Sequence, residues 1–370
     1  MTWVVLVSLL GPFLISLVST FIVRAVSRRI GFIDQPGGHK QHGRLVALGG
    51  GVAFFATISG ALLLGTWIGK SYVAADVPSW FPVALVPHLP GIAAKFPSVL
   101  AILGCTLLLH IVGLIDDRKP LGPWFKLAIQ VAMALVVAWP LGIRAVQFLP
   151  APLSVLITVL WIVVITNAFN FLDNMDGLSA GVAAIAAGIF GLAAAGSGQV
   201  FVPMMCWVVV GSLVGFLCLN FSPASIFMGD AGSLVIGFLL GVVTILTTFY
   251  DPSKNLTPIG VFVPLLVLAV PLYDVTSVVI HRHRLGQSPF RGDRRHFSHR
   301  LVRRGMSDRG AVMTIYLATA ATGLPAIVLP RLTDWTDATL LLIQCLCVVL
   351  IIAILEHAGM AWDKPQNLDP

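Results

Sequence analysis

Residues 152–177 read PLSVLITVLWIVVITNAFNFLDNMDG, an uncharged apolar run that ends in polar and acidic side chains. The apolar part is long enough for a helix that crosses about 30 Å of hydrocarbon. Its backbone groups must then be satisfied within the segment, which a helix achieves. Polar residues recur at every third position from Asn167 to Asp176, and these three steps, of about 60° each, lead half way round a straight helix. We therefore expect the helix to break near 173–177.

Similar apolar runs occupy most of the chain. The 370 residues are 57% hydrophobic and 11% charged, with a mean hydropathy of +0.94, whereas soluble domains carry about 25% charged residues. The composition excludes a soluble fold and predicts an all-α polytopic membrane protein, a single domain over 1–370. Eleven transmembrane spans are expected, near 3–23, 48–69, 97–115, 127–143, 152–169, 178–195, 201–221, 233–249, 259–280, 311–330 and 338–356.

The distribution of Lys and Arg predicts the orientation. With the N-terminus outside, the outer segments contain only five of the 23 Lys and Arg residues, namely Lys70, Lys95, Arg144, Lys254 and Arg331. Because basic residues concentrate on the cytoplasmic side, we expect the C-terminus to be cytoplasmic. The net charge of +7 is then mainly a topology signal, and no basic stripe with stacking aromatics predicts nucleic-acid binding.

Most acids lie at the inner ends of the predicted spans, where an ionisable group indicates function. Asp116 and Asp117 end one span. Such paired carboxylates can bind a divalent cation or supply a base, although a polar helix end paired with Arg118 and Lys119 is the alternative. In the run FMGDAGS, Asp230 can ligate Mg²⁺ or cap the following helix.

Two further inner loops complete the pattern. The loop with Asp173 and Asp176 has no Lys or Arg, so a metal or a substrate is expected to supply the positive partner; turn chemistry is the alternative. The loop 281–310 contains nine Arg and no Lys, and its Arg and His side chains suit phosphate oxygens, although a positive-inside anchor also explains many Arg. Asp274 is a buried ion-pair partner or part of the site. Together these loops indicate metal-dependent phosphoryl transfer at one membrane face.

These motifs, taken in order, resemble those of the polyprenyl-phosphate N-acetylhexosamine-1-phosphate transferases. The matching elements are Asp34-x-Pro36 with Lys40, His42 and Gly49-Gly50; Asp116-Asp117; Asn167 to Gly177; Phe227 to Ser233; and Pro271-x-x-Asp274 followed by the Arg-rich loop. The resemblance implies that a UDP-N-acetylhexosamine gives its sugar-1-phosphate to undecaprenyl phosphate and releases UMP. It also implies Mg²⁺, for which Mn²⁺ can substitute, and a cytoplasmic site in the bacterial inner membrane. A homodimer is compatible with the resemblance.

The same resemblance assigns residue roles. Asp116 or Asp117 would deprotonate or position the lipid phosphate, with His296 as a further catalytic residue. Asp230 and Asp173 would hold the metal. Substrate contacts would come from Asn170, Asp176, Phe227, Lys126, Arg294, Arg295, His299, Lys40 and His42.

Two positions depart from the family pattern. Ser298 precedes His299 where the family often has a second His, and Asn174 replaces a usual Gly. The form of the last loop is more similar to the branch that makes O-antigen and teichoic-acid linkage units. The phospho-N-acetylmuramoyl-pentapeptide transferase is the alternative within the family. A transporter is the alternative of another class, although transporters place acids near the bilayer centre.

Overall fold

The computed structural model describes residues 2–34, 45–73, 77–79, 81–250, 253, 256–284, 286 and 296–357, and most of them are helical. The α-helices are α1 (Thr2–Arg29), α2 (Gly50–Val73), α3 (Leu89–Ala94), α4 (Phe96–Arg118), α5 (Pro123–Ala138), α6 (Ala151–Leu172), α7 (Leu178–Gly196), α8 (Phe201–Asn220), α9 (Asp230–Leu246), α10 (Val263–Val267), α11 (Ala269–Arg284), α12 (Phe297–Arg303), α13 (Asp308–Gly323) and α14 (Trp335–His357). Short 3₁₀ helices cover Val83–His88, Pro258–Phe262, Leu324–Ile327 and Leu329–Arg331.

Within the described residues, eight helices are long and apolar enough to cross a membrane, and one bent pair passes the same test together. The chain is thus an all-α polytopic membrane protein, as predicted. Two other predicted spans correspond to shorter apolar helices, α5 and α9. Helix α5 has 16 residues and α9 has 17, which at 1.5 Å per residue gives about 24–26 Å.

The predicted ninth span, 259–280, corresponds to a bent pair of helices. Helices α10 and α11 meet at an angle of 64°, with Leu268 between them in a non-helical conformation. Pro271 has no N–H, so it cannot donate to the carbonyl of Val267 four residues earlier, and a helix bends at such a point. The bend lets α11 continue as far as Arg284 and carry Asp274.

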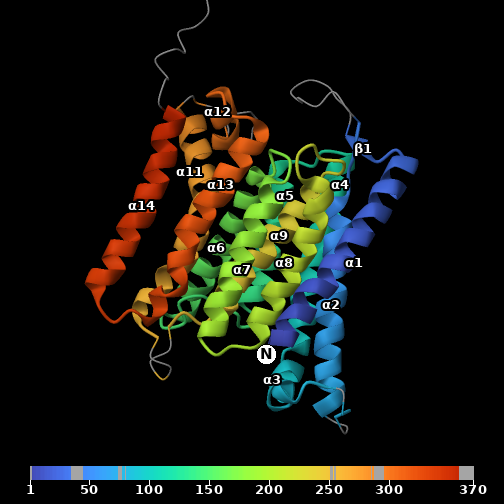
Figure 1. Cartoon of the computed structure of the whole chain (residues 1–370), viewed down its shortest axis with the longest axis vertical. Helices are drawn as coiled ribbons and strands as arrows, with labels where there is room; N and C mark the ends of the chain where they lie inside the picture. The colour runs from blue at the N-terminus through green and yellow to red at the C-terminus, as the bar shows by residue number, and fades with distance from the viewer. Residues whose placement is uncertain are drawn as a thin grey trace, which may run out of the picture.

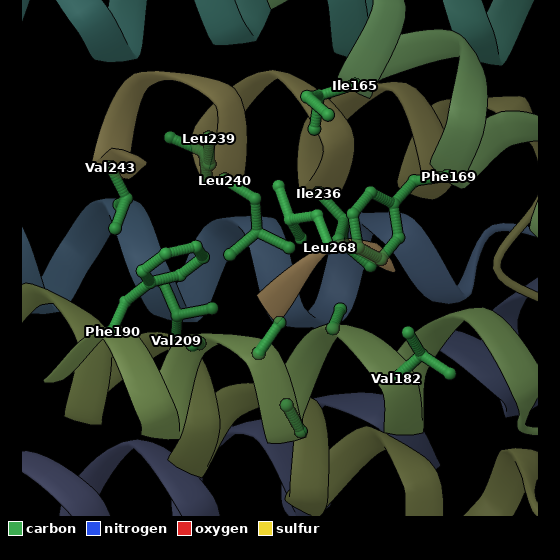
Figure 2. Close-up of a cluster of buried hydrophobic side chains, with 14 of the residues drawn as sticks. Ile165, Phe169, Val182, Phe190, Val209, Ile236, Leu239, Leu240, Val243 and Leu268 are labelled. Atoms are coloured by element: carbon green, nitrogen blue, oxygen red, sulfur yellow. The ribbon is translucent and has the colours of Figure 1, made fainter. Parts of the chain in front are cut away.

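Helix α9 is the buried centre of the bundle. Nearly all of its side chains from Ala231 to Thr244 are buried, and it packs against α2, α4, α6 and α7. Figure 2 shows its apolar side chains, including Ile236 and Leu240, among those of Ile165 and Phe190 on α6 and α7. In Figure 1, α12 and β1 lie at one end of the bundle, while α3 and the N-terminus lie at the other.

Close backbone contacts fix where α9 begins. A Cβ atom on Gly113 of α4 would lie 2.4 Å from Ala231 Cα, and one on Gly51 of α2 would lie 2.5 Å from Gly232 N. Only glycine permits this approach, and small residues serve the same purpose at helix contacts in membranes. The first turn of α9 therefore lies directly against both α2 and α4.

A small sheet that we did not predict fixes the loop before α9. Strands β1 (Ile33–Asp34) and β2 (Val46–Ala47) pair antiparallel, and Ala47 forms a parallel bridge with Ile226. The backbone N–H of Phe227 donates to Ala47 O at 2.8 Å, and that of Gly50 donates to Phe227 O at 2.9 Å. The loop 221–229 is thus attached to the chain that precedes α2.

At the other side of the bundle, a buried carboxylate joins three helices. Glu356 on α14 accepts a hydrogen bond from Tyr273 Oη of α11 at 2.6 Å and pairs with Arg300 of α12 at 3.0 Å. Arg304 donates to the backbone carbonyl of Glu356 at 3.1 Å. These contacts fix α12, whose first residue follows His296, relative to α11 and α14.

The contact of α4 with α9 predicts a contrast between two glycines of one helix. Gly113→Ala places a methyl group into the Ala231 backbone, so it should lower stability by about 1–3 kcal/mol. Gly104→Ala meets nothing within 4 Å and should be neutral or slightly stabilising. Melting temperatures of the purified variants in one detergent measure the difference. Equal melting temperatures would contradict the close contact.

Candidate active site

The paired aspartates at the end of α4 have different partners. Asp117 accepts hydrogen bonds from the backbone N–H groups of Asp230, at 2.8 Å, and Ala231, at 3.2 Å. These are the first two residues of α9, so a side chain of α4 caps α9. Gly229, at φ +67°, turns the chain into the helix, and a Cβ there would lie 2.4 Å from the Asp117 carboxylate. The N-cap residue, Gly229, has no side chain to cap the helix, and the Asp230 carboxylate accepts from Lys126 and Asn170.

Lys126, in the first turn of α5, connects the other aspartate to Asp230. Its Nζ atom lies 3.0 Å from Asp116 Oδ2 and 2.7 Å from Asp230 Oδ2. Asp116 also accepts the backbone N–H of Leu121 at 2.6 Å. The three charged side chains are partly exposed, so a ligand can reach them. A cation thus already lies between two carboxylates that come from different helices.

The asparagines of α6 extend this cluster. Asn170 Nδ2 donates to Asp230 Oδ1 at 3.0 Å and to Ser233 Oγ at 2.9 Å. One turn earlier, Asn167 donates to Gln130 of α5 at 2.5 Å. Amide groups spaced three residues apart therefore join α6 to α9 and to α5. Ser233 was part of the quoted FMGDAGS run but had no predicted role, and Gln130 was not predicted, because an uncharged side chain gives no local signal of a partner on another helix.

The predicted break after α6 is confirmed. The helix ends at Leu172, and Gly177 adopts φ +75° before α7 begins at Leu178. Asp176 Oδ2 accepts the backbone N–H of Ala224 at 2.8 Å, so this proposed substrate ligand also fixes the 221–229 loop.

Asp173 lies at the end of α6, next to the other acids. Its burial, together with the negative charges of Asp230, Asp117 and Asp176, raises the pKa of Asp173 well above its usual range. The acids predicted from separate motifs are therefore close enough in space to repel one another.

The His-containing segment meets the end of α6. His296 Nδ1 lies 2.9 Å from Asp274 Oδ2, and Asp274 Oδ1 accepts the backbone N–H of Phe297 at 3.1 Å. The Phe171 ring lies edge-on to the His296 ring, with centroids 6.0 Å apart. The Arg282 guanidinium lies 5.4 Å from the centroid of the Phe171 ring. Asp274 is thus both a buried partner of a basic group and a contact of the candidate site. Phe171 and Arg282 were not predicted.

The two departures from the family pattern contact each other. Ser298 Oγ donates to Asn174 Oδ1 at 2.6 Å, which joins α12 to the α6–α7 loop. His299 lies one residue further along α12 and is partly exposed. Phe227 is partly buried in the loop before α9, on the same side as Asp117.

Four predicted substrate ligands, Lys40, His42, Arg294 and Arg295, lie outside the described residues. Among the residues that the structure describes, no three His, Cys, Asp or Glu side chains converge closely enough to hold a metal ion as they stand. The donor chemistry nevertheless fits Mg²⁺, which prefers carboxylate oxygens. Two of those oxygens already contact the Lys126 ammonium group.

Comparison with known proteins follows the same motifs. The model of glycosyl transferase family 4 matches residues 99–248, which include the paired aspartates, the asparagines and Asp230. A probable undecaprenyl-phosphate N-acetylglucosaminyl 1-phosphate transferase of Bacillus subtilis is 30% identical over 97% of this chain and 94% of its own length.

Undecaprenyl-phosphate alpha-N-acetylglucosaminyl 1-phosphate transferases are similar over slightly shorter stretches. The one from Yersinia pestis is 28% identical over 90% of this chain and 87% of its own. The one from Escherichia coli K12 is 27% identical over 84% of this chain and 80% of its own. Together with the matching motifs, these similarities show that the chain belongs to glycosyl transferase family 4.

Proposed function

We propose that the protein transfers an N-acetylhexosamine 1-phosphate from a UDP-sugar to undecaprenyl phosphate, releases UMP, and acts in cell-envelope polysaccharide synthesis. The observation that carries the proposal is the convergence of Asp116, Lys126, Asp230 and Asn170 at one end of a membrane-spanning bundle. The names of the relatives support the acceptor and the sugar. A site at the membrane surface suits a reaction between one lipid and one soluble substrate.

The reaction joins two anions. An oxygen of the lipid phosphate attacks the phosphorus that carries the sugar, and a new P–O–P linkage forms. The P–O bond between the two phosphates of the donor breaks, and its electron pair leaves on UMP. The protein must therefore neutralise charge and align the reacting oxygens. Lys126 supplies a positive charge beside both Asp116 and Asp230.

The contacts favour separate roles for the paired aspartates. Asp117 uses both carboxylate oxygens to accept backbone N–H groups of α9, so it acts as a positioning residue for Asp230. Asp116, whose side chain is partly exposed beside Lys126, is the better candidate to orient the lipid phosphate or accept its proton. Near this cluster, Asn170 fixes the second carboxylate oxygen of Asp230.

A magnesium ion, held by Asp230 and Asp173, would neutralise charge that develops on the donor phosphates. The support is electrostatic: Lys126 pairs with Asp116 and Asp230, and the negative charges of Asp230, Asp117 and Asp176 act on Asp173. Burial, and after it these neighbouring charges, raises the pKa of Asp173 well above its usual range. A bound cation would relieve the repulsion among the carboxylates.

His296 is the proposed partner of a substrate phosphate. The hydrogen bond from its Nδ1 atom to Asp274 orients the imidazole ring and leaves Nε2 for the substrate. Phe171 packs against one edge of the ring, which restricts its rotation. The neighbouring Arg-rich segment is proposed to attract the donor phosphates, because guanidinium groups bind phosphate oxygens bidentately.

We further propose eleven membrane crossings, with the N-terminus outside and the site facing the cytoplasm of a bacterial inner membrane. In this arrangement α5, α9 and the bent α10–α11 pair each count as one crossing. The excess of Lys and Arg on the site side supports the orientation. Because α9 is surrounded by other helices, its short length does not expose its ends to lipid.

The assay for the proposed function measures UMP release from a panel of UDP-sugars with undecaprenyl phosphate. Wild-type protein should release UMP with a UDP-N-acetylhexosamine. Asp116→Asn should lower kcat roughly 10²-fold, as expected for a lost charge in a transition state, without changing the melting temperature. Asp117→Asn should lower the melting temperature as well, because the NH₂ group that replaces one carboxylate oxygen cannot accept the N–H group bound there.

Asp308→Asn is the matched control for this assay, since Asp308 is exposed at the start of α13 and contacts none of the cluster. It should retain wild-type turnover. No lipid-dependent UMP release from any UDP-sugar would exclude the proposed transfer.

The metal proposal predicts a binding defect that can be measured without turnover. Mn²⁺ has an electron-spin resonance signal and chemistry similar to that of Mg²⁺, so titration into purified protein reports binding directly. Asp230→Asn removes a charged ligand and should weaken Mn²⁺ binding at least about tenfold. Asp308→Asn, at an exposed position at the start of α13, should bind as wild type does. Equal affinities would leave Asp230 a structural role only.

Orientation can be tested by cysteine labelling. The labelled cysteines are introduced in a variant that lacks the exposed Cys218 and Cys347. Lys119→Cys places a thiol beside the aspartates at the end of α4, and Lys70→Cys places one in the last turn of α2, at the opposite end of the bundle. An impermeant thiol reagent applied to intact cells should label only position 70. Position 119 should react after the membrane is opened. Labelling of position 119 in intact cells would reverse the proposed topology.

A further inference from the structure

A cavity of about 330 Å³ lies at the end of the bundle opposite the aspartates. Its walls come from the start of α4, the start of α8, the end of α9 and the loop after α5. Helix α4 runs from Phe96, beside the cavity, to Arg118, beside the active site; its 23 residues correspond to about 35 Å. The cavity therefore belongs to a separate region that the proposed transfer does not use.

The charged side chains that line this cavity are both basic. Lys95 and Arg144 line it, and the described lining residues include no Asp or Glu. Arg144 Nε is buried and has no hydrogen-bond partner in the described part of the chain. A buried guanidinium donor without a partner is unfavourable, and a phosphate or carboxylate oxygen would satisfy it.

The loop that carries Arg144 is held in place by α6. The backbone N–H of Ala145 donates to Thr158 Oγ1 at 2.9 Å, and Ser154 Oγ donates to Ala145 O at 2.7 Å. Next to it, Val146 adopts φ +52°, a conformation that β-branched residues rarely adopt. The N–H and C=O groups of Ala145, the residue after Arg144, are thus both hydrogen-bonded to α6. The backbone that carries the Arg144 side chain is therefore held in one position.

The opposite wall is also ordered by side-chain hydrogen bonds. Gln199 Nε2 donates to Leu246 O at 3.0 Å, and Gln199 Oε1 accepts the backbone N–H of Thr248 at 3.0 Å. The first of these bonds satisfies a carbonyl at the C-terminal end of α9, which would otherwise repel an anion. This wall of the cavity is therefore ordered, and one of its acceptors is already satisfied.

The rest of the lining combines apolar side chains, among them Leu62, Val99, Ile102, Phe201, Met205 and Ile245, with the polar side chains of Ser98, Gln147 and Thr248. A free inorganic ion gains nothing from the apolar part, whereas a molecule with an anionic polar head and an apolar body contacts both parts. The cavity also lies where the membrane-crossing helices end, which is the depth of lipid headgroups. We propose that this cavity binds the phosphate headgroup of an anionic lipid in the leaflet opposite the active site.

The test uses the full chain, purified in detergent and titrated with phosphatidylglycerol, with bound lipid counted by native mass spectrometry. Arg144→Gln should bind phosphatidylglycerol at least about fivefold more weakly than wild type, and Arg144→Lys should recover part of the loss. Lys70→Gln removes an exposed cation at the same end of the bundle but outside the cavity, and it should bind as wild type does. Equal affinity of Arg144→Gln and wild type would overturn the proposal.

Competition separates the sources of the phosphate group. If millimolar inorganic phosphate does not displace the lipid, the lipid headgroup is the ligand. If inorganic phosphate binds in an Arg144-dependent way and displaces the lipid, the ligand is free phosphate and the lipid proposal is overturned. Phosphatidylcholine that binds as tightly as phosphatidylglycerol would overturn recognition of negative charge. UMP release and melting temperature show whether Arg144→Gln is folded. If Arg144→Gln does not fold, the same lipid titration is done with Lys95→Gln, which changes an exposed residue of the cavity lining.

Discussion

The first two backbone N–H groups of α9 point into the protein, and the Asp117 carboxylate accepts both. A buried helix end without such a partner would be strongly destabilising. The glycines at 51 and 113 allow α2 and α4 to approach closely enough for this contact. Once α9 begins at Asp230, that residue reaches Lys126 and Asn170. The arrangement of the candidate site therefore depends on one carboxylate that caps a helix to which it does not belong.

Charge balance links this arrangement to phosphoryl transfer. In the described part of the cluster, Lys126 pairs with Asp116 and Asp230. Burial, together with the negative charges of Asp230, Asp117 and Asp176, raises the pKa of Asp173. Anionic substrates approach such a cluster only with additional positive charge, which a divalent ion and the Arg-rich segment can supply. Because these acids lie at helix ends rather than in the middle of the spans, the arrangement favours an enzyme at a membrane surface over a transporter.

Apolar runs and acidic motifs predicted the helical membrane fold and the residues that converge, because span length and charge placement are local properties. Partners across the bundle were not predictable. Asp117 was expected to act on substrate, yet its contacts are with α9; nothing near position 117 specifies that neighbour. The bend at Leu268 depends on how Pro271 is accommodated, and the pairing of Ile33 with Ala47 brings together short segments with little periodicity. Asn174 and Ser298 were noted separately as departures, but only the fold shows that they contact each other.

Glu356, the single glutamate of the chain, bears on biosynthesis. Its buried carboxylate joins Tyr273 and Arg300, and Arg300 belongs to the short helix that directly follows His296. The ribosome adds Glu356 126 residues after Asp230, the last aspartate of the cluster. A nascent polypeptide can therefore insert the helices that carry the aspartates long before the histidine segment is anchored. The two halves of the candidate site are thus completed at different times during synthesis.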